Sequence, residues 1–176
     1  MDDVALITSQ TTDAYEWTNE LLETIPLELW HTCPDIIEST LAWQTGHLIL
    51  SHYFYAIMVI NGHQKGLLEQ LPMKDYDALY NTNSPTSTID KHDPAVLFEH
   101  LKVVQASSLK LIGQLNSDEL YKPLESLDKP HPIAKNKLEA LDWNNKHTMY
   151  HCGQIGLLKR IVLERHNFRL GKQLKH

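Results

Sequence analysis

The chain has 176 residues, of which 42% are hydrophobic, and its 16 Lys and Arg against 22 Asp and Glu give a formal net charge of −6. This length and composition favour a single domain, residues 1–176, that can bury its own core. The acidic balance, without a run of Lys and Arg, argues against a nucleic-acid partner. Neither of the two common glycine-rich phosphate-binding motifs occurs.

The ends and the cysteines of the chain favour a cytoplasmic protein without a membrane partner. Two aspartates follow Met1, where a secretory signal would be basic, and the longest nearly apolar stretch, 48–60, is too short to span a bilayer. The two cysteines, Cys33 and Cys152, form no disulfide framework and are expected to be reduced thiols. The tail, 167–176, is expected to be solvated.

Apolar residues recur at steps of three and four in four stretches, which predicts four helices. The first runs from about Ile7 to Ile25, where Pro26 ends it. The second begins near Thr32, which can act as a cap, or a turn later at Ser39, and Gly62 ends it. Its expected buried line is Trp43, His47, Leu50, Phe54 and Ile57.

A long segment, 62–92, separates the second helix from the third, and a connection of this length often forms a lid. The third helix opens with Asp93 as a cap and Pro94 at the first helical position, and continues to Leu115. The fourth runs over about 133–165. Four amphipathic helices bury their apolar stripes most simply against one another, so the predicted fold is an all-α four-helix bundle.

The fourth helix carries polar residues where a core-facing stripe should be apolar. Steps of four and three from Ala140 lead to Leu158, but the positions between them hold amides and imidazoles. These four residues are Asn144, His147, His151 and Gln154. A polar group buried without a partner costs about 1–3 kcal/mol, so this line must be satisfied by something.

Histidine is abundant, with 11 residues, and it is the commonest metal ligand. His147 and His151 are four residues apart on one helical face, so their rings can converge on one ion. His47 replaces an apolar residue on the second helix and is the third candidate ligand. The residues expected to line a pocket beside them are Trp43, Asn144 and Gln154. The alternative is a hydrogen-bonded polar network in the core.

Residues 43–48, Trp-Gln-Thr-Gly-His-Leu, and residues 147–155, His-Thr-Met-Tyr-His-Cys-Gly-Gln-Ile, resemble the DinB family of small metal-binding four-helix bundles. That family includes bacillithiol- and mycothiol-dependent S-transferases. The resemblance implies that His47, His147 and His151 surround a divalent ion. It also implies an up-down-down-up arrangement, with 62–92 as the crossover between the second and third helices, and a homodimer.

Three neutral histidines leave at least one coordination position open on zinc or nickel, which is typical of a catalytic site. Together with the resemblance, this favours a metal-dependent enzyme that transfers a low-molecular-weight thiol to a small electrophile. A hydrolase that uses a metal-bound water is a second hypothesis, although no acidic residue on the buried line can serve as its general base. A non-catalytic metal-binding or structural bundle is a third. No catalytic residue beyond the metal ligands is assigned.

Overall fold

The computed structural model describes residues 2–128 and 130–168, and within these residues the chain forms helices and no β-strand. The all-α prediction is therefore confirmed. No helix in the described part of the chain is both long enough and apolar enough to cross a membrane. Most of the tail that was expected to be solvated, residues 169–176, lies outside the described residues.

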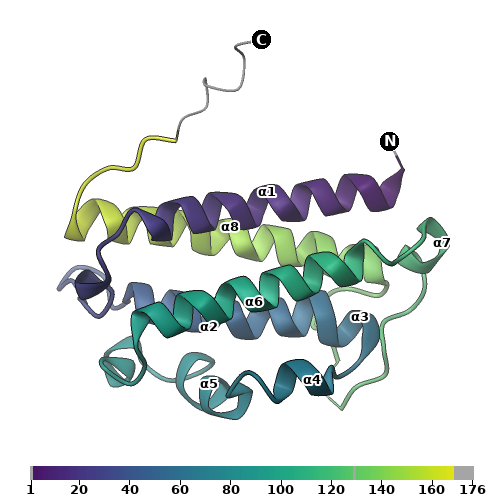
Figure 1. Cartoon of the computed structure of the whole chain (residues 1–176), viewed down its shortest axis with the longest axis horizontal. Helices are drawn as coiled ribbons and strands as arrows, with labels where there is room; N and C mark the ends of the chain where they lie inside the picture. The colour runs from purple at the N-terminus through teal and green to yellow at the C-terminus, as the bar shows by residue number, and fades with distance from the viewer. Residues whose placement is uncertain (1, 129, 169–176) are drawn as a thin grey trace, which may run out of the picture.

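Four long helical segments form the bundle (Figure 1). They are α1 (Asp3–Glu23), α2 (Leu41–Tyr53) with its continuation, α6 (Pro94–Ile112) and α8 (Lys137–Val162). Helix α2 continues through a π-helical turn, Phe54–Met58, into the short α3 (Val59–Asn61). Figure 1 shows α1 and α8 running in one direction and α2 and α6 in the other. Helix α1 packs mainly against α8, and α2 mainly against α6.

Each long helix begins at a side chain that accepts a hydrogen bond from the first turn. Asp2 caps α1, Thr40 caps α2, Asp93 caps α6 and Asn136 caps α8. Such caps satisfy backbone N–H groups that have no partner inside the helix. At α6 the cap is the predicted Asp93, with Pro94 at the first position.

The prediction that the second helix starts near Thr32 is wrong, and the rival start at Ser39 lies next to the true cap, Thr40. The preceding chain forms a short 3-10 helix, Leu27–Leu29, and then buries Trp30 completely. The Trp30 indole donates to the Ile25 carbonyl, 3.2 Å away. The buried Trp30 holds the chain between α1 and α2 as a compact link, and α2 therefore begins only at Leu41.

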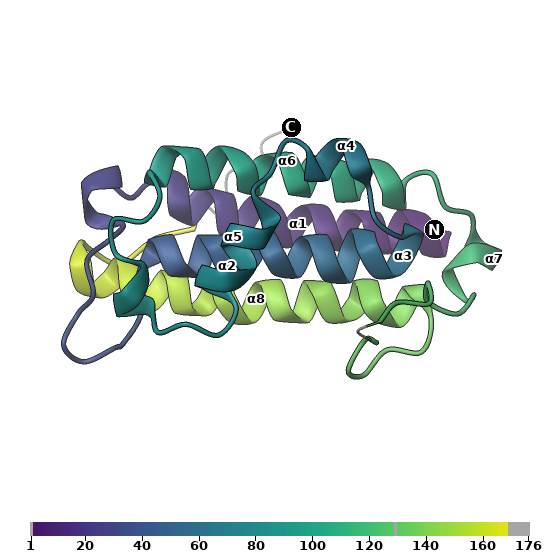
Figure 2. The same cartoon turned by 90° about the horizontal axis from the view of Figure 1, so that it is seen from below.

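The long crossover between α3 and α6 is folded. It contains α4 (Lys65–Leu68), α5 (Met73–Tyr80) and a 3-10 helix at Pro85–Thr88. Figures 1 and 2 show α4 and α5 beside α2 and α6, on the side away from α1. Tyr76 and Tyr80 of α5 are completely buried, so their aromatic rings hold the crossover against the bundle.

The predicted buried line on the second helix is only partly correct. Ile57 is buried, but Trp43, His47, Leu50 and Phe54 are half-buried. Helices α6 and α8 and the crossover all contact α2. Because α2 is covered from several sides, an apolar stripe does not identify its one buried face. The half-buried line instead faces the edge of the bundle, where the crossover lies.

Candidate metal centre

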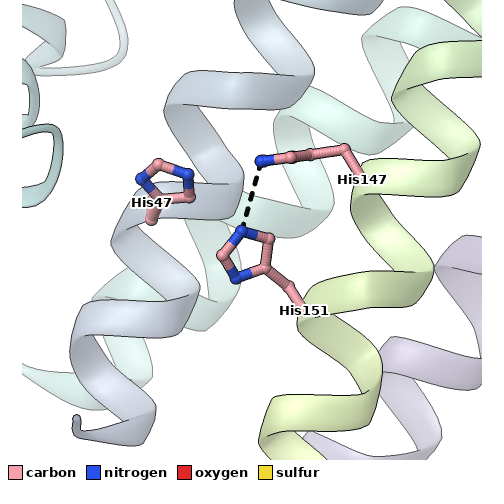
Figure 3. Close-up of side chains that lie close together, drawn as sticks. All are labelled: His47, His147 and His151. Carbon is pink, nitrogen blue, oxygen red and sulfur yellow. Dashed lines mark hydrogen bonds between the residues drawn. The ribbon is translucent and has the colours of Figure 1, made fainter. Parts of the chain in front are cut away.

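Three imidazoles from two neighbouring helices lie together at this edge. His47 comes from α2, and His147 and His151 come from successive turns of α8. Their potential ligand atoms all lie within 4.8 Å of one another. Figure 3 shows the three rings turned toward a common region between the helices. The predicted ligands are thus close together in space, and together they can hold a metal ion.

Hydrogen bonds fix which ring nitrogen carries the proton in two of these histidines. The Nδ1–H of His47 donates to the Tyr80 carbonyl oxygen at 2.9 Å, and the Nδ1–H of His151 donates to the Gln44 Oε1 at 2.6 Å. A neutral imidazole has one proton, so Nε2 of each ring keeps its lone pair. Metal-binding histidines in proteins are oriented by the same kind of outer hydrogen bond.

The separation of the pair on α8 also suits an ion. Nε2 of His147 and Nε2 of His151 are 3.2 Å apart. Two nitrogens bound at 2.0–2.1 Å in tetrahedral geometry would be about 3.3 Å apart. Three imidazoles without a thiolate form a donor set that accepts zinc, nickel, copper or iron. The residues present therefore fit a divalent transition metal.

The surroundings keep the three rings neutral. Burial lowers the pKa of His47 below its usual value, although the hydrogen bond to Tyr80 opposes this shift. Burial, together with repulsion from His47, lowers the pKa of His147 to about 4. Burial and the neighbouring histidines depress the pKa of His151 further. Near pH 7 all three imidazoles are neutral, and the neutral imidazole is the form that binds a metal.

Gln44 connects the centre to Gln154. Its side-chain Nε2 donates to Ser39 Oγ and to Gln154 Oε1, both at 2.8 Å. These two bonds fix the amide so that its oxygen faces His151. Gln154, which was expected to line a pocket, thus contacts the centre through Gln44.

Trp43 covers one side of His47. The two rings stack at 5.0 Å between centroids, with 9° between their planes. The Trp43 indole donates to the Asn83 carbonyl oxygen at 3.1 Å. Trp43 therefore restricts the His47 ring from one face and is itself held by the crossover.

Asn144 lies in a different environment from the other predicted site residues. It is buried, and its Nδ2 donates to the Tyr15 hydroxyl at 3.2 Å. Tyr15 bonds to Ser108, and the nearby Thr148 bonds to His52. His52, which comes from α2, is completely buried. This group, from Tyr15 to His52, is a hydrogen-bonded core network of the kind that the alternative hypothesis predicted for the whole polar stripe, but Asn144 is its only member among the four polar positions of that stripe.

Two residues that orient the ligands were missed. Gln44 is buried three positions before His47, and a second polar residue on one face of an apolar helix was a usable signal. Tyr80 acts through its backbone carbonyl, which every residue has, so no side-chain pattern points to it. Its ring also occupies the space beside Gly46, where an added Cβ would collide with it.

The sequence profile of the DinB superfamily matches residues 10–155. The chain belongs to the DinB superfamily. No curated protein sequence matches this DinB superfamily member. Among solved structures, it is similar to a conserved protein from Enterococcus faecalis, with a TM-score of 0.65 at 16% identity, over 93% of this chain and 98% of that one.

It is also similar to the colibactin self-resistance protein ClbS in complex with double-stranded DNA, with a TM-score of 0.59 at 18% identity, over 89% of this chain and 95% of that one. The exclusion of a nucleic-acid partner was therefore wrong, because a protein of this fold is found with DNA. A net charge describes the whole chain and not one surface of it. The expected homodimer is also not retained, since neither the comparisons nor the described residues indicate a second copy.

Proposed function

We propose that this DinB superfamily protein is a metal-dependent transferase that joins a low-molecular-weight thiol to a small electrophile, with zinc or nickel as its metal. The observation that carries the proposal is the convergence of three neutral histidines, two of which have their lone pairs set by hydrogen bonds from Nδ1. His47 also lines a cavity, so a small molecule can lie beside the centre.

A bound divalent ion would supply positive charge that lowers the pKa of a thiol and makes it a nucleophilic thiolate near pH 7. The three imidazoles are neutral, so they leave that positive charge undiminished. In the transfer, sulfur forms a bond to the electrophilic carbon while the bond to the leaving group breaks. The leaving group takes that electron pair, and the thiol proton passes to solvent.

Hydrolysis is a weaker alternative for the same centre. A water nucleophile benefits from a general base, and the three-histidine group contains no carboxylate. Asp77 lines the cavity, but its carboxylate accepts a hydrogen bond from Asn81 and lies on the exposed side of α5. A thiol depends less on a general base than water does, because the pKa of a thiol is already near 8.5.

The test combines metal analysis with a thiol panel. Purified protein should contain near-stoichiometric zinc or nickel, and the double variant His147→Ala/His151→Ala should contain almost none. The wild type should accelerate conjugation of bacillithiol, mycothiol or glutathione to monobromobimane, and the variant should not. A metal-loaded protein that accelerates none of these conjugations, or a metal-free one that conjugates equally well, would overturn the proposal.

The DNA-bound neighbour favours a second candidate function, which is binding of double-stranded DNA. Fluorescence anisotropy of a labelled duplex, titrated with the protein at 50 and 200 mM salt, tests it. Contacts to phosphates should make the affinity fall steeply as salt increases. A flat titration at the lower salt concentration would eliminate this candidate.

A further inference from the structure

A cavity of about 580 Å³ lies next to the metal centre, with His47 in its wall. Its other walls come from the π-helical turn after α2, from the crossover and from the prolines at 130 and 132. Sites for small molecules usually enclose about 300–1,000 Å³. The cavity therefore has room for a ligand of that class.

The π-helical turn determines which side chains face this space. Its widened turn leaves Phe54, Tyr55 and Met58 half-buried, all three in the cavity wall. Such turns are rare and often occur at functional sites. Leu68 and Met73 of the crossover line the same cavity. These walls are apolar, and methionines adapt their shape to aromatic ligands.

Most polar side chains in the cavity wall already have hydrogen-bond partners within the protein. Ser51 donates to a carbonyl of its own helix, the Tyr53 hydroxyl contacts His63, and Asn81 donates to Asp77. A polar ligand would have to give up its water for few replacement partners, and that exchange is unfavourable. An apolar ligand gives up no hydrogen bonds to water when it enters.

The charges at the mouth of the cavity balance. Lys74 and Asp77 both line it, both are exposed, and they lie three positions apart on α5. Opposite charges this close largely cancel at the distance of a ligand inside the cavity. Lys74 and Asp77 together therefore add no net charge to the cavity wall.

We infer that this cavity binds an uncharged, largely apolar small molecule, and that this molecule is the electrophile of the proposed transfer. The second part rests on the proposed function, and the first part does not. The apolar part of this small molecule would contact the wall formed by the π-helical turn and Leu68.

The first experiment measures binding alone. The probe is N-phenyl-1-naphthylamine, an uncharged apolar fluorophore, and its matched analogue is 8-anilino-1-naphthalenesulfonate, which adds a sulfonate. The uncharged probe should bind about tenfold more tightly than the charged one. Met58→Trp and Leu68→Trp, which fill the cavity, should each weaken its binding about tenfold. Leu157→Trp is the control, because Leu157 is 50% exposed on α8 and does not line the cavity.

The second experiment measures conjugation of one thiol to monobromobimane, which is an uncharged conjugated bicyclic molecule, and to iodoacetate, which is small and anionic. In the first reaction sulfur bonds to the bromomethyl carbon, bromide leaves and the thiol proton goes to solvent. Relative to the uncatalysed rates, kcat/KM should favour monobromobimane, and Leu68→Trp should raise its KM about tenfold without loss of metal or of helical content.

The two experiments fail in different ways. Absence of probe binding, or equal binding by Leu68→Trp, Met58→Trp and wild type, would overturn the cavity assignment whatever the activity. Normal probe binding that both tryptophan variants abolish, with no conjugation of any thiol, would leave the assignment standing and reject the proposed transfer.

Discussion

Two groups of polar side chains each include residues of α8, and they differ in how their hydrogen-bonding capacity is used. In the core network, Tyr15 donates to Ser108, Asn144 donates to Tyr15, and His52 donates to Thr148. In the metal centre the Nδ1–H groups of His47 and His151 donate to Tyr80 and Gln44, and Nε2 of His147 lies at hydrogen-bond distance, 3.2 Å, from Nε2 of His151. His147 Nδ1 has no partner among the described residues. A polar residue on a buried stripe indicates a ligand site when ring nitrogens of several such residues lie close together.

The difference also shows in what each group contributes. The network places donors against acceptors inside the bundle, although His52 Nδ1 and Asn144 Oδ1 have no partner among the described residues. Such a network holds the helices in register. The centre places three neutral imidazoles together. That arrangement adds little to the fold by itself and becomes stabilising when an ion binds.

The largest expected effect separates the two groups directly. His151→Ala removes one of three ligands and should lower metal affinity by more than about a hundredfold, with metal content after dialysis as the measurement. Tyr15→Phe should keep the metal but lower the free energy of unfolding by about 1–3 kcal/mol, because Asn144 loses its acceptor. If Tyr15→Phe also lost its metal, the two groups would form one unit and the comparison would fail.

A smaller loss of affinity is expected from a residue that touches neither ion nor ligand ring. In Gly46→Ala the new methyl group would collide with the Tyr80 ring, so the carbonyl that holds His47 must move. Loss of an outer hydrogen bond typically costs about 10–100-fold in metal affinity. Competition with a chelator measures it. Gly153→Ala is the control, since its added Cβ meets nothing within 4 Å; equal affinities would contradict the role of Tyr80.

The orientation of His151 gives a graded test. Gln44→Leu removes the acceptor for its Nδ1–H and should lower metal affinity by about tenfold. Gln154→Leu removes only one of the two groups that hold the Gln44 amide, so its effect should be about threefold or less. The same chelator competition measures both variants. A larger effect from Gln154→Leu would mean that Gln154 approaches the ion itself.

The smallest effect is expected from a change of pH between 7 and 6 in the metal-free protein. Burial lowers the pKa of His52 to about 3 and that of His147 to about 4, whereas an unfolded histidine has a pKa near 6.5. Below pH 6.5 the unfolded chain binds more protons than the folded one, so stability is lost as pH falls. Urea unfolding should show a lower midpoint at pH 6, lower again at pH 5. His52→Gln should reduce the dependence of the urea midpoint on pH. A midpoint that stays constant from pH 7 to pH 5 would contradict the neutral state of the buried His52 and His147.

The helical class was predicted correctly from the amino-acid pattern alone, and so were the candidate ligands as residues that lie together. Apolar residues at steps of three and four form amphipathic helices in any context that can bury them. The Asp93 and Pro94 pair placed the start of α6, because a cap and its first turn are local. The spacing of His147 and His151 placed two imidazoles on one face, and their neighbours Asn144 and Gln154 marked α8 as unusual.

Which polar residues contact one another depends on how the helices pack. Asn144 and His151 lie on the same stripe of α8, but Asn144 faces Tyr15 of α1 while His151 faces Gln44 of α2. The orientation of His47 depends on Tyr80, more than thirty residues away in the crossover. A periodic pattern records which side of a helix is apolar and not which neighbour covers it. The packing of α1, α2 and the crossover around α8 therefore separated a core network from a centre that can bind a metal.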